Sequence, residues 1–224
     1  MSRERKMLII GHRGDMDNFP ENSIEGISSA LEKGTDGVEF DVFYKPGIGV
    51  YLQHSFDHDP LQPYPRLTDV FERFSGKGIL VIEIKQPETE AVDAVAELIR
   101  KYEVPDFEIT SCVLPLLSYV HEVLPEARIG MNVRPHLLEK WMTKGLRIYF
   151  LINYLKLTGA ENIWLSRPRN FWDKDTVSQF HNSGFRVCSQ LLTGNKEEFE
   201  RMLSMGIDAC TADNLNVLQW RDNE

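Results

Sequence analysis

Charged side chains stand inside short segments that are otherwise apolar. Glu39 and Asp41 occupy alternate positions of one such run, Glu83 and Lys85 alternate in another, and a third run ends at His12. Because side chains alternate faces along a strand, the two members of each pair point the same way. Charges in such strands cost free energy unless they are paired or bind a metal. The pattern therefore predicts one polar site within an apolar scaffold.

Three of these residues, Glu39, Asp41 and Glu83, form a predicted cluster of carboxylates. Three like charges repel one another, so the cluster needs positive charge close by. All-oxygen ligands favour a hard ion, and we expect one divalent cation, Mg²⁺ or Ca²⁺, rather than zinc. The alternative is that the carboxylates pair with Arg or Lys in an ion network inside the fold.

Two histidines that follow apolar runs, His12 and His54, are the candidates for general acid and general base. Imidazole suits both roles because it titrates near neutral pH. His58, four residues after His54, is a rival that spacing alone does not rank. Arg13 and Lys85 would bring positive charge to an oxyanion. Together with a metal, these groups suit attack on a phosphodiester, in which charge builds on the phosphoryl oxygens.

Elements that would position these residues alternate along the whole chain. Eight strand-and-helix units follow one another in 224 residues, and a further short strand over residues 50–54 falls in a loop. Strands that alternate with helices indicate a parallel sheet, and eight units favour a (β/α)₈ TIM barrel of the α/β class. We expect one domain over residues 1–224. Active sites of such barrels lie at the C-terminal ends of the strands, where the charged residues stand.

Two local patterns give more detailed expectations. Asn22, with Glu25 three residues later, predicts the N-cap of the first helix. Between Pro135 and about Leu157 the pattern is ambiguous, and it predicts either one long helix or two helices that meet at Gly145.

Composition limits the partners of the protein. The formal net charge of −9 disfavours nucleic acid and anionic membranes, because binding to them depends on attraction to phosphate. No apolar stretch approaches the 18 residues of a spanning helix, so we expect no stable membrane association. Cys112, Cys188 and Cys210 are few and unclustered, which indicates reduced thiols in a cytoplasmic protein. The expected partner is a small phosphodiester.

In order and spacing, several motifs resemble the glycerophosphodiester phosphodiesterase family. They are Gly11-His12-Arg13-Gly14, Pro20-Glu21-Asn22-Ser23, Glu39-Phe40-Asp41-Val42, the His54 that follows, and Ile82-Glu83-Ile84-Lys85. Weaker similarities reach the end of the chain, at Thr110-Ser111 and at Gly206-Ile207-Asp208 leading to Asp213. The resemblance covers nearly the whole chain, and the N-terminal set is specific only in combination.

This resemblance implies a TIM barrel that hydrolyses glycerophosphodiesters to an alcohol and glycerol 3-phosphate. It also implies roles for individual residues: His12 and His54 as the acid/base pair, Glu39, Asp41 and Glu83 as ligands of one divalent ion, Arg13 and Lys85 as phosphate contacts, and Glu21 and Asn22 as supporting residues. The alcohol half of the substrate stays open.

The chain departs from the family pattern at three places. Ser55 follows His54 where the family has Asp, so the partner that orients His54 is missing or is replaced by Asp57 or Asp59. The segment after His54 is short where the family often inserts a subdomain. Residues 190–195, on the seventh barrel strand, lack the Trp that lines the glycerol side of the site in the family. The substrate-facing wall is therefore expected to differ.

Other functions compatible with the same residues are a related phosphodiesterase or lyase with another head group or a cyclic phosphate product, and a non-catalytic barrel that binds phosphate esters. Both histidines and all three carboxylates are present, which argues against the non-catalytic barrel. A metal-dependent amidohydrolase is disfavoured, because the first strand lacks a His-x-His pair.

Overall fold

Strands and helices alternate along the part of the chain that the computed structural model describes, residues 6–56, 63–134, 137–165, 172–192 and 194–221. The strands are β1 (Leu8–His12), β2 (Gly37–Lys45), β3 (Gly49–Leu52), β4 (Ile79–Ile84), β5 (Phe107–Ser111), β6 (Arg128–Val133), β7 (Asn162–Leu165), β8 (Arg186–Leu192) and β9 (Ala209–Ala212). The α-helices are α1 (Ile24–Glu32), α2 (Leu67–Phe74), α3 (Thr89–Lys101), α4 (Leu114–Val123), α5 (Lys144–Thr158), α6 (Lys174–Asn182), α7 (Lys196–Met205) and α8 (Leu218–Arg221).

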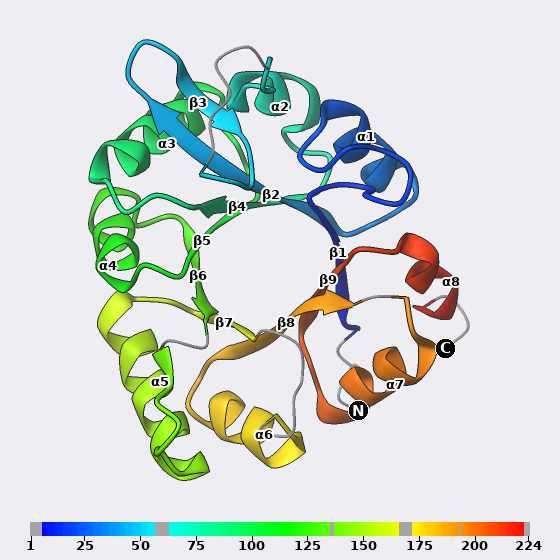
Figure 1. Ribbon diagram of the computed structural model, residues 1–224, viewed down its shortest axis with the longest axis vertical. Coiled ribbons are helices and arrows are strands. Elements are labelled where there is room, and N and C mark those ends of the chain that lie inside the picture. Colours follow the sequence, from blue (N-terminus) through cyan, green and yellow to red (C-terminus); the bar gives the residue numbers. More distant parts are fainter. Residues whose placement is uncertain (1–5, 57–62, 135–136, 166–171, 193, 222–224) are drawn as a thin grey trace.

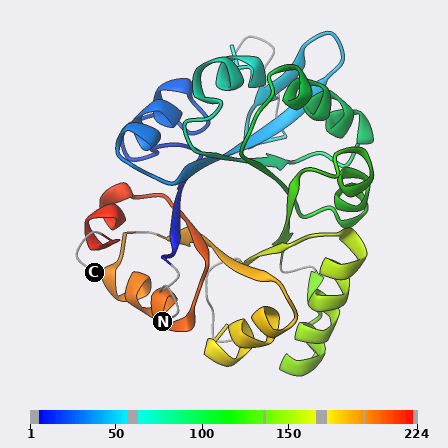
Figure 2. The same cartoon turned by 180° about the vertical axis from the view of Figure 1, so that it is seen from behind.

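The sheet closes on itself. Its strand order is β1-β9-β8-β7-β6-β5-β4-β2-β3, and a further parallel pairing of β1 with β2 closes a ring of eight parallel strands. β3 pairs antiparallel with β2 and stands outside that ring. The helices surround the ring, as the two opposite views in Figures 1 and 2 show. The predicted (β/α)₈ barrel is confirmed, with β3 as the extra strand expected over residues 50–54.

Apolar side chains form two separate clusters. The large cluster joins the outer faces of the strands to the surrounding helices. The small one contains Ile10, Val81, Trp164, Cys188 and Ala209. Ile10 and Val81 share a strand face with His12 and Glu83 by the two-residue alternation, so this small cluster fills the barrel interior beneath the polar residues.

The first helix begins one residue later than expected. Ser23 is the N-cap of α1, and its Oγ accepts a hydrogen bond from the backbone N–H of Gly26. The prediction of Asn22 as the N-cap is wrong, because Asn22 has a φ of 58° and turns its side chain towards β2 instead. A tertiary contact has overridden the capping preference of Asn, and Ser23 satisfies the helix terminus in its place.

The region between β6 and β7 contains one α-helix in its described part. α5 begins at Lys144, where the hydroxyl of Thr143 caps it, and ends at Gly159 in the left-handed conformation. Gly145 lies in the first turn of α5, so the expectations of a helix from Pro135 and of two helices that meet at Gly145 are both wrong. Residues 135–136 lie outside the described part. None of the described helices combines the length and apolar character that crossing a membrane requires.

The parallel pairing of β2 with β4 aligns two residues of the site. Gly37 pairs with Ile79, and four residues later the same register places Asp41 opposite Glu83. A Cβ added at Gly37 would lie 2.2 Å from the backbone oxygen of Ile79. Only glycine fits here without displacing one of the two strands.

We therefore expect Gly37→Ala to lower the free energy of unfolding by about 1–3 kcal/mol, the usual cost of overpacking. Gly145→Ala is the matched control, because a Cβ there meets nothing within 4 Å. In a helix, that exchange is neutral or stabilising. Urea unfolding of both variants measures the difference, and equal stability of Gly37→Ala and wild type would contradict the packing argument.

Candidate active site

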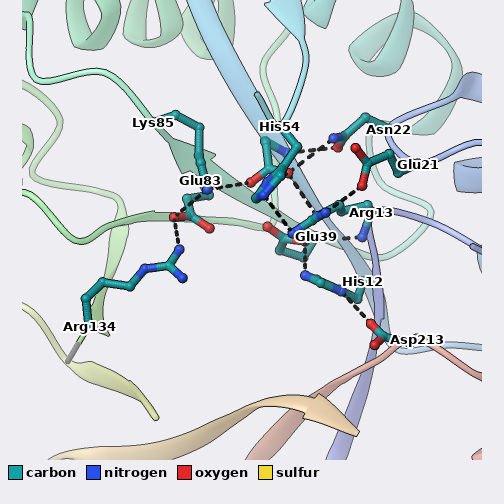
Figure 3. A network of polar contacts seen from close by, with 11 residues as sticks. His12, Arg13, Glu21, Asn22, Glu39, His54, Glu83, Lys85, Arg134 and Asp213 are labelled. Atoms are coloured by element: carbon teal, nitrogen blue, oxygen red, sulfur yellow. Dashed lines mark hydrogen bonds and ion pairs between the residues drawn. The ribbon is translucent and has the colours of Figure 1, made fainter. Parts of the chain in front are cut away.

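Polar residues from the ends of neighbouring strands meet at one end of the barrel. The register pairs His12 of β1 with Glu39 of β2, and Asp41 of β2 with Glu83 of β4. Lys85 follows directly after β4. Figure 3 shows how the side chains around Glu39 point towards one another. The strand ends that the sequence indicated are thus brought together.

The three predicted carboxylates form a compact buried cluster. One oxygen each from Glu39, Asp41 and Glu83 lies within 4.8 Å of the others, and the three side chains are nearly inaccessible to solvent. Burial, followed by repulsion from Asp41 and Glu83, raises the pKa of Glu39 well above its usual value. Of the three carboxyl groups, Glu39 is therefore the one that keeps its proton to a higher pH than an ordinary glutamate does.

Asp41 is the most densely contacted of the three. Its Oδ2 accepts a hydrogen bond from Asn22 Nδ2 at 3.1 Å and lies 3.1 Å from both His54 Nδ1 and Arg13 Nε. Its Oδ1 faces Lys85 Nζ at 3.2 Å. Burial opposes ionisation, but His54, Lys85 and Arg13 outweigh it and lower the pKa of Asp41. Asp41 therefore stays charged as the centre of an ion network.

Arg13 links this centre to the loop that follows β1. Its backbone N–H donates to Glu39 Oε2 at 3.2 Å, and its guanidinium pairs with Glu21 as well as Asp41. Arg13 has a φ of 52°, in the left-handed region that few non-glycine residues occupy. Asn22 accepts from the backbone N–H of Asp41 at 3.0 Å while it donates to the carboxylate. The two expected supporting residues therefore each contact a main group of the site: Glu21 contacts Arg13, and Asn22 contacts Asp41.

His12 is oriented by a carboxylate that the sequence reasoning gave no role. Its Nδ1 lies 2.5 Å from Asp213 Oδ1, and its Nε2 faces Glu39 Oε2 at 3.8 Å. A carboxylate only accepts hydrogen bonds, so Nδ1 carries a proton and Nε2 remains available towards the cluster. Asp213 follows β9, and its position just after a strand was the signal that could have identified it.

His54 is oriented by Asp41 rather than by a residue of its own loop. Its Nδ1 contacts Asp41 Oδ2, and its Nε2 lies 3.3 Å from Arg13 Nη2. Because a guanidinium only donates, the contact with Arg13 fits the tautomer in which Nε2 accepts and Nδ1 donates to Asp41. The absence of Asp at position 55 therefore does not leave His54 without a carboxylate. Asp57, His58 and Asp59 lie outside the described residues.

A third cation reaches the cluster from the opposite side. Arg134 Nη2 donates to Glu83 Oε1 at 3.0 Å, and Lys85 Nζ contacts the same oxygen at 3.2 Å. Arg134 comes directly after β6, so it repeats the strand-end pattern of His12, and the sequence reasoning missed it. Figure 3 shows Arg134 approaching Glu83 from the side away from Arg13.

A pocket extends from this network across the barrel mouth. It is lined by His12, Arg13, Glu39, Val81, Glu83, Thr110, Asn132, Arg134, Trp164 and Thr211. The lining combines polar groups that offer hydrogen bonds with the apolar surfaces of Val81 and Trp164. A small polar ligand can therefore reach the carboxylates from within the barrel.

The donor set fits one hard cation. Among the described residues, Glu39 has no Lys or Arg side chain within ion-pair distance, whereas Asp41 and Glu83 each have two. Asp41 Oδ1 is buried and lacks a hydrogen bond of good geometry. Mg²⁺ and Ca²⁺ bind carboxylate oxygens of this kind, and Glu39 would join them on losing its proton. The ion network and this set of possible metal ligands thus share the same residues.

Comparisons with known proteins agree with this geometry. The model of the glycerophosphoryl diester phosphodiesterase family matches residues 12–44, which include His12, Arg13, Glu39 and Asp41. A glycerophosphodiester phosphodiesterase of Caldanaerobacter subterraneus subsp. tengcongensis is 24% identical over 256 residues, covering 95% of this chain and 96% of that protein. The resemblance of the sequence to this family is therefore confirmed.

Solved structures show the same fold. A glycerophosphodiester phosphodiesterase of Thermotoga maritima aligns with a TM-score of 0.75 and 22% identity, covering 96% of this chain and 97% of that one. A phosphodiesterase of Oleispira antarctica, solved in complex with the product sn-glycerol-3-phosphate, aligns with a TM-score of 0.80 and 18% identity, covering 97% of both chains.

The pKa of Glu39 is raised and that of Asp41 is lowered, so replacing each carboxyl by an amide should have opposite effects on stability. Without added metal, we expect Glu39→Gln to raise the free energy of unfolding by about 1 kcal/mol and Asp41→Asn to lower it by about 3 kcal/mol, since the latter leaves buried cations unpaired. Urea unfolding in chelator measures both. A change of the same sign in the two variants would contradict the charge distribution described above.

The pH dependence follows from the raised pKa of Glu39. The folded protein holds the Glu39 proton to a higher pH than the unfolded chain does, so the stability from this group is lost as pH rises from the ordinary glutamate range to the raised pKa. Glu39→Gln should flatten that decline when the same unfolding series is repeated across pH.

Proposed function

We propose that this protein is a phosphoric diester hydrolase that cleaves glycerophosphodiesters to an alcohol and glycerol 3-phosphate. One observation carries the proposal: His12 and His54, each in contact with a carboxylate of its own, lie beside the cluster formed by Glu39, Asp41 and Glu83. The confirmed family resemblance supports the reaction type. The product complex of the Oleispira antarctica relative supports glycerol 3-phosphate as a ligand.

Glu39, Asp41 and Glu83 are proposed as the ligands of one divalent cation, Mg²⁺ or Ca²⁺. When bound, such a cation supplies positive charge that stabilises the phosphoryl oxygens. Arg13 and Lys85 already contact Asp41, and they are proposed to hold the substrate phosphate next to it. Fixed donors of this kind stabilise the charge that grows during phosphoryl transfer.

The two histidines carry the protons of the proposed reaction. An oxygen–phosphorus bond forms from water, and the bond from phosphorus to the alcohol oxygen breaks. One imidazole takes the proton that water loses, and the other, which must be protonated beforehand, gives its proton to the departing alcohol. Asp213 and Asp41 stabilise the imidazolium of His12 and His54 respectively, because each contacts the Nδ1 nitrogen.

Glu21 and Asn22 are proposed as supporting residues. Glu21 holds the guanidinium of Arg13, and Asn22 holds Asp41 through both its side chain and its backbone N–H. A cytoplasmic location is also proposed, because Cys112, Cys188 and Cys210 are all free thiols, as a reducing compartment favours.

Removing either catalytic imidazole should abolish most of the activity. We expect His12→Ala and His54→Ala to release glycerol 3-phosphate at least about 10²-fold more slowly, the usual contribution of general acid–base catalysis. An enzyme-coupled assay of glycerol 3-phosphate measures the rate, and phosphorus NMR identifies the product.

The matched control is His121→Ala, since His121 lies on the exposed side of α4, away from the pocket. Normal turnover by His12→Ala would overturn the proposed reaction. A cyclic phosphate that accumulates in the NMR spectrum would assign the chemistry to a lyase instead.

Metal binding should be visible without any assay of turnover. A site filled at about 100 times its dissociation constant stabilises the fold by about 2.7 kcal/mol, so Mg²⁺ or Ca²⁺ should raise the melting temperature of the chelator-treated protein. Because Glu39 must lose its proton to bind a cation, the increase should shrink as pH falls.

Differential scanning fluorimetry with NaCl of equal ionic strength as the control measures this increase. The double variant Glu39→Gln, Glu83→Gln should lose it. An equal increase in that variant would show that the cation binds elsewhere.

A further inference from the structure

Trp164 lies at the bottom of the pocket. It comes from β7, it is 3% exposed, and it belongs to the small apolar cluster of the barrel interior. Among the described residues that line the pocket, it supplies the only indole or phenyl ring. A flat apolar surface at this depth meets whichever part of a ligand reaches furthest into the barrel.

The indole is held by a buried carboxyl group that the proposed chemistry does not use. Trp164 Nε1 donates to Glu108 Oε1 at 2.6 Å, and Asn162 Nδ2 donates to Glu108 Oε2 at 2.7 Å. Glu108, on β5, is 4% exposed, and burial raises its pKa despite these bonds. A polar group in an interior of this kind costs free energy unless it is hydrogen-bonded, so the carboxyl and the indole depend on each other.

β6, which lies between β5 and β7, leaves room for the contact between Glu108 and Trp164. A Cβ added at Gly130, on β6, would lie 2.3 Å from Glu108 Oε1 and 2.8 Å from Trp164 Cδ1. The register places Gly130 between Thr110 of β5 and Asn162 of β7. Three consecutive strands therefore fix the ring in one orientation.

The pocket surface near Trp164 matches a short polyol. Thr110 and Asn132 offer hydrogen-bond donors and acceptors, and Val81 and Trp164 offer apolar surface. Arg13 and Lys85, the proposed phosphate contacts, lie beside Asp41, so an arm of the diester that entered the barrel would meet the indole.

We propose that Trp164 is a specificity-determining residue against which the carbon chain of the glycerol arm packs, and that Glu108 is a positioning residue that fixes the indole through Nε1. The assignment rests on the proposed function.

An NMR experiment on the indole N–H tests the contact directly. In the ¹⁵N-labelled protein, the indole resonance of Trp164 is the one that disappears in Trp164→Phe. It should shift when glycerol 3-phosphate is added, because the ligand packs on the ring. Trp172→Phe is the control, since Trp172 is buried against Phe180 away from the pocket. A Trp164 resonance that does not move at saturating glycerol 3-phosphate would overturn the proposal.

A pair of Glu108 variants tests the positioning role. Glu108→Gln keeps an acceptor for the indole, whereas Glu108→Leu removes it at similar volume. We expect Glu108→Leu to raise the KM for a glycerophosphodiester and the Kd for glycerol 3-phosphate about tenfold, with kcat changed less than about threefold, and Glu108→Gln to stay near wild type. Thermal unfolding verifies that both variants fold. Equal KM values for two folded variants would contradict the positioning role.

Failure of this inference and failure of the proposed function give different results. Turnover of bis(p-nitrophenyl) phosphate, which has no glycerol arm, reports the chemistry alone. A wild-type protein that turns over diesters while the Trp164 resonance and the Glu108 variants show no effect would overturn the inference only. A resonance that shifts in a protein without turnover would support the pocket assignment and overturn the hydrolase.

Discussion

Repulsion among three buried carboxylates is the constraint on which the site depends. Glu39, Asp41 and Glu83 present oxygens within 4.8 Å of one another at the end of a barrel whose outer face packs on the helices through an apolar core. Such a cluster is stable only when positive charge surrounds it. Arg13, Lys85 and Arg134 supply that charge from three different strand ends. The parallel register of the barrel brings these cations together, so the fold and the charge balance depend on each other.

The positive charge is not shared equally among the three carboxyl groups. Asp41 is hydrogen-bonded by Asn22, and His54, Lys85 and Arg13 outweigh its burial and lower its pKa. Within the described part of the chain no Lys or Arg side chain pairs with Glu39, and burial together with its two acidic neighbours raises its pKa. Asp41 therefore organises the site before any ligand arrives, whereas Glu39 holds a proton that a divalent cation would have to displace.

Much of this arrangement could be predicted from the sequence, because strand-end charges are visible as polar residues in apolar runs. That signal identified His12, Glu39, Asp41, Glu83 and Lys85, and the barrel follows from the alternation of strands and helices. Contacts between distant segments carry no such signal. The pairing of His12 with Asp213 spans 201 residues. Asn22 has the composition of a helix cap, and only the approach of Asp41 turns it away.

Other features depended on three-dimensional neighbours in the same way. The orientation of His54 appeared uncertain from Ser55, yet Asp41, thirteen residues earlier, supplies the carboxylate. Arg134 repeats the strand-end pattern but follows a strand that carries no acidic residue, so nothing in its local sequence sets it apart. Trp164 reads as a core residue until Glu108 is placed beside it. The periodicity of the sequence shows which side chains face the barrel interior. Which of them come into contact depends on how the strands pack around the barrel.

The central claim is that the cluster of Glu39, Asp41 and Glu83 binds a divalent cation beside the two histidines. The most direct measurement is the crystal structure of the protein grown with Mn²⁺, using the anomalous signal to locate the metal. The account predicts one peak bounded by oxygens of all three carboxylates, with Lys85 and Arg134 displaced from the oxygens that bind it. A structure in which the three carboxylates keep their Arg and Lys partners and the manganese lies elsewhere would contradict it.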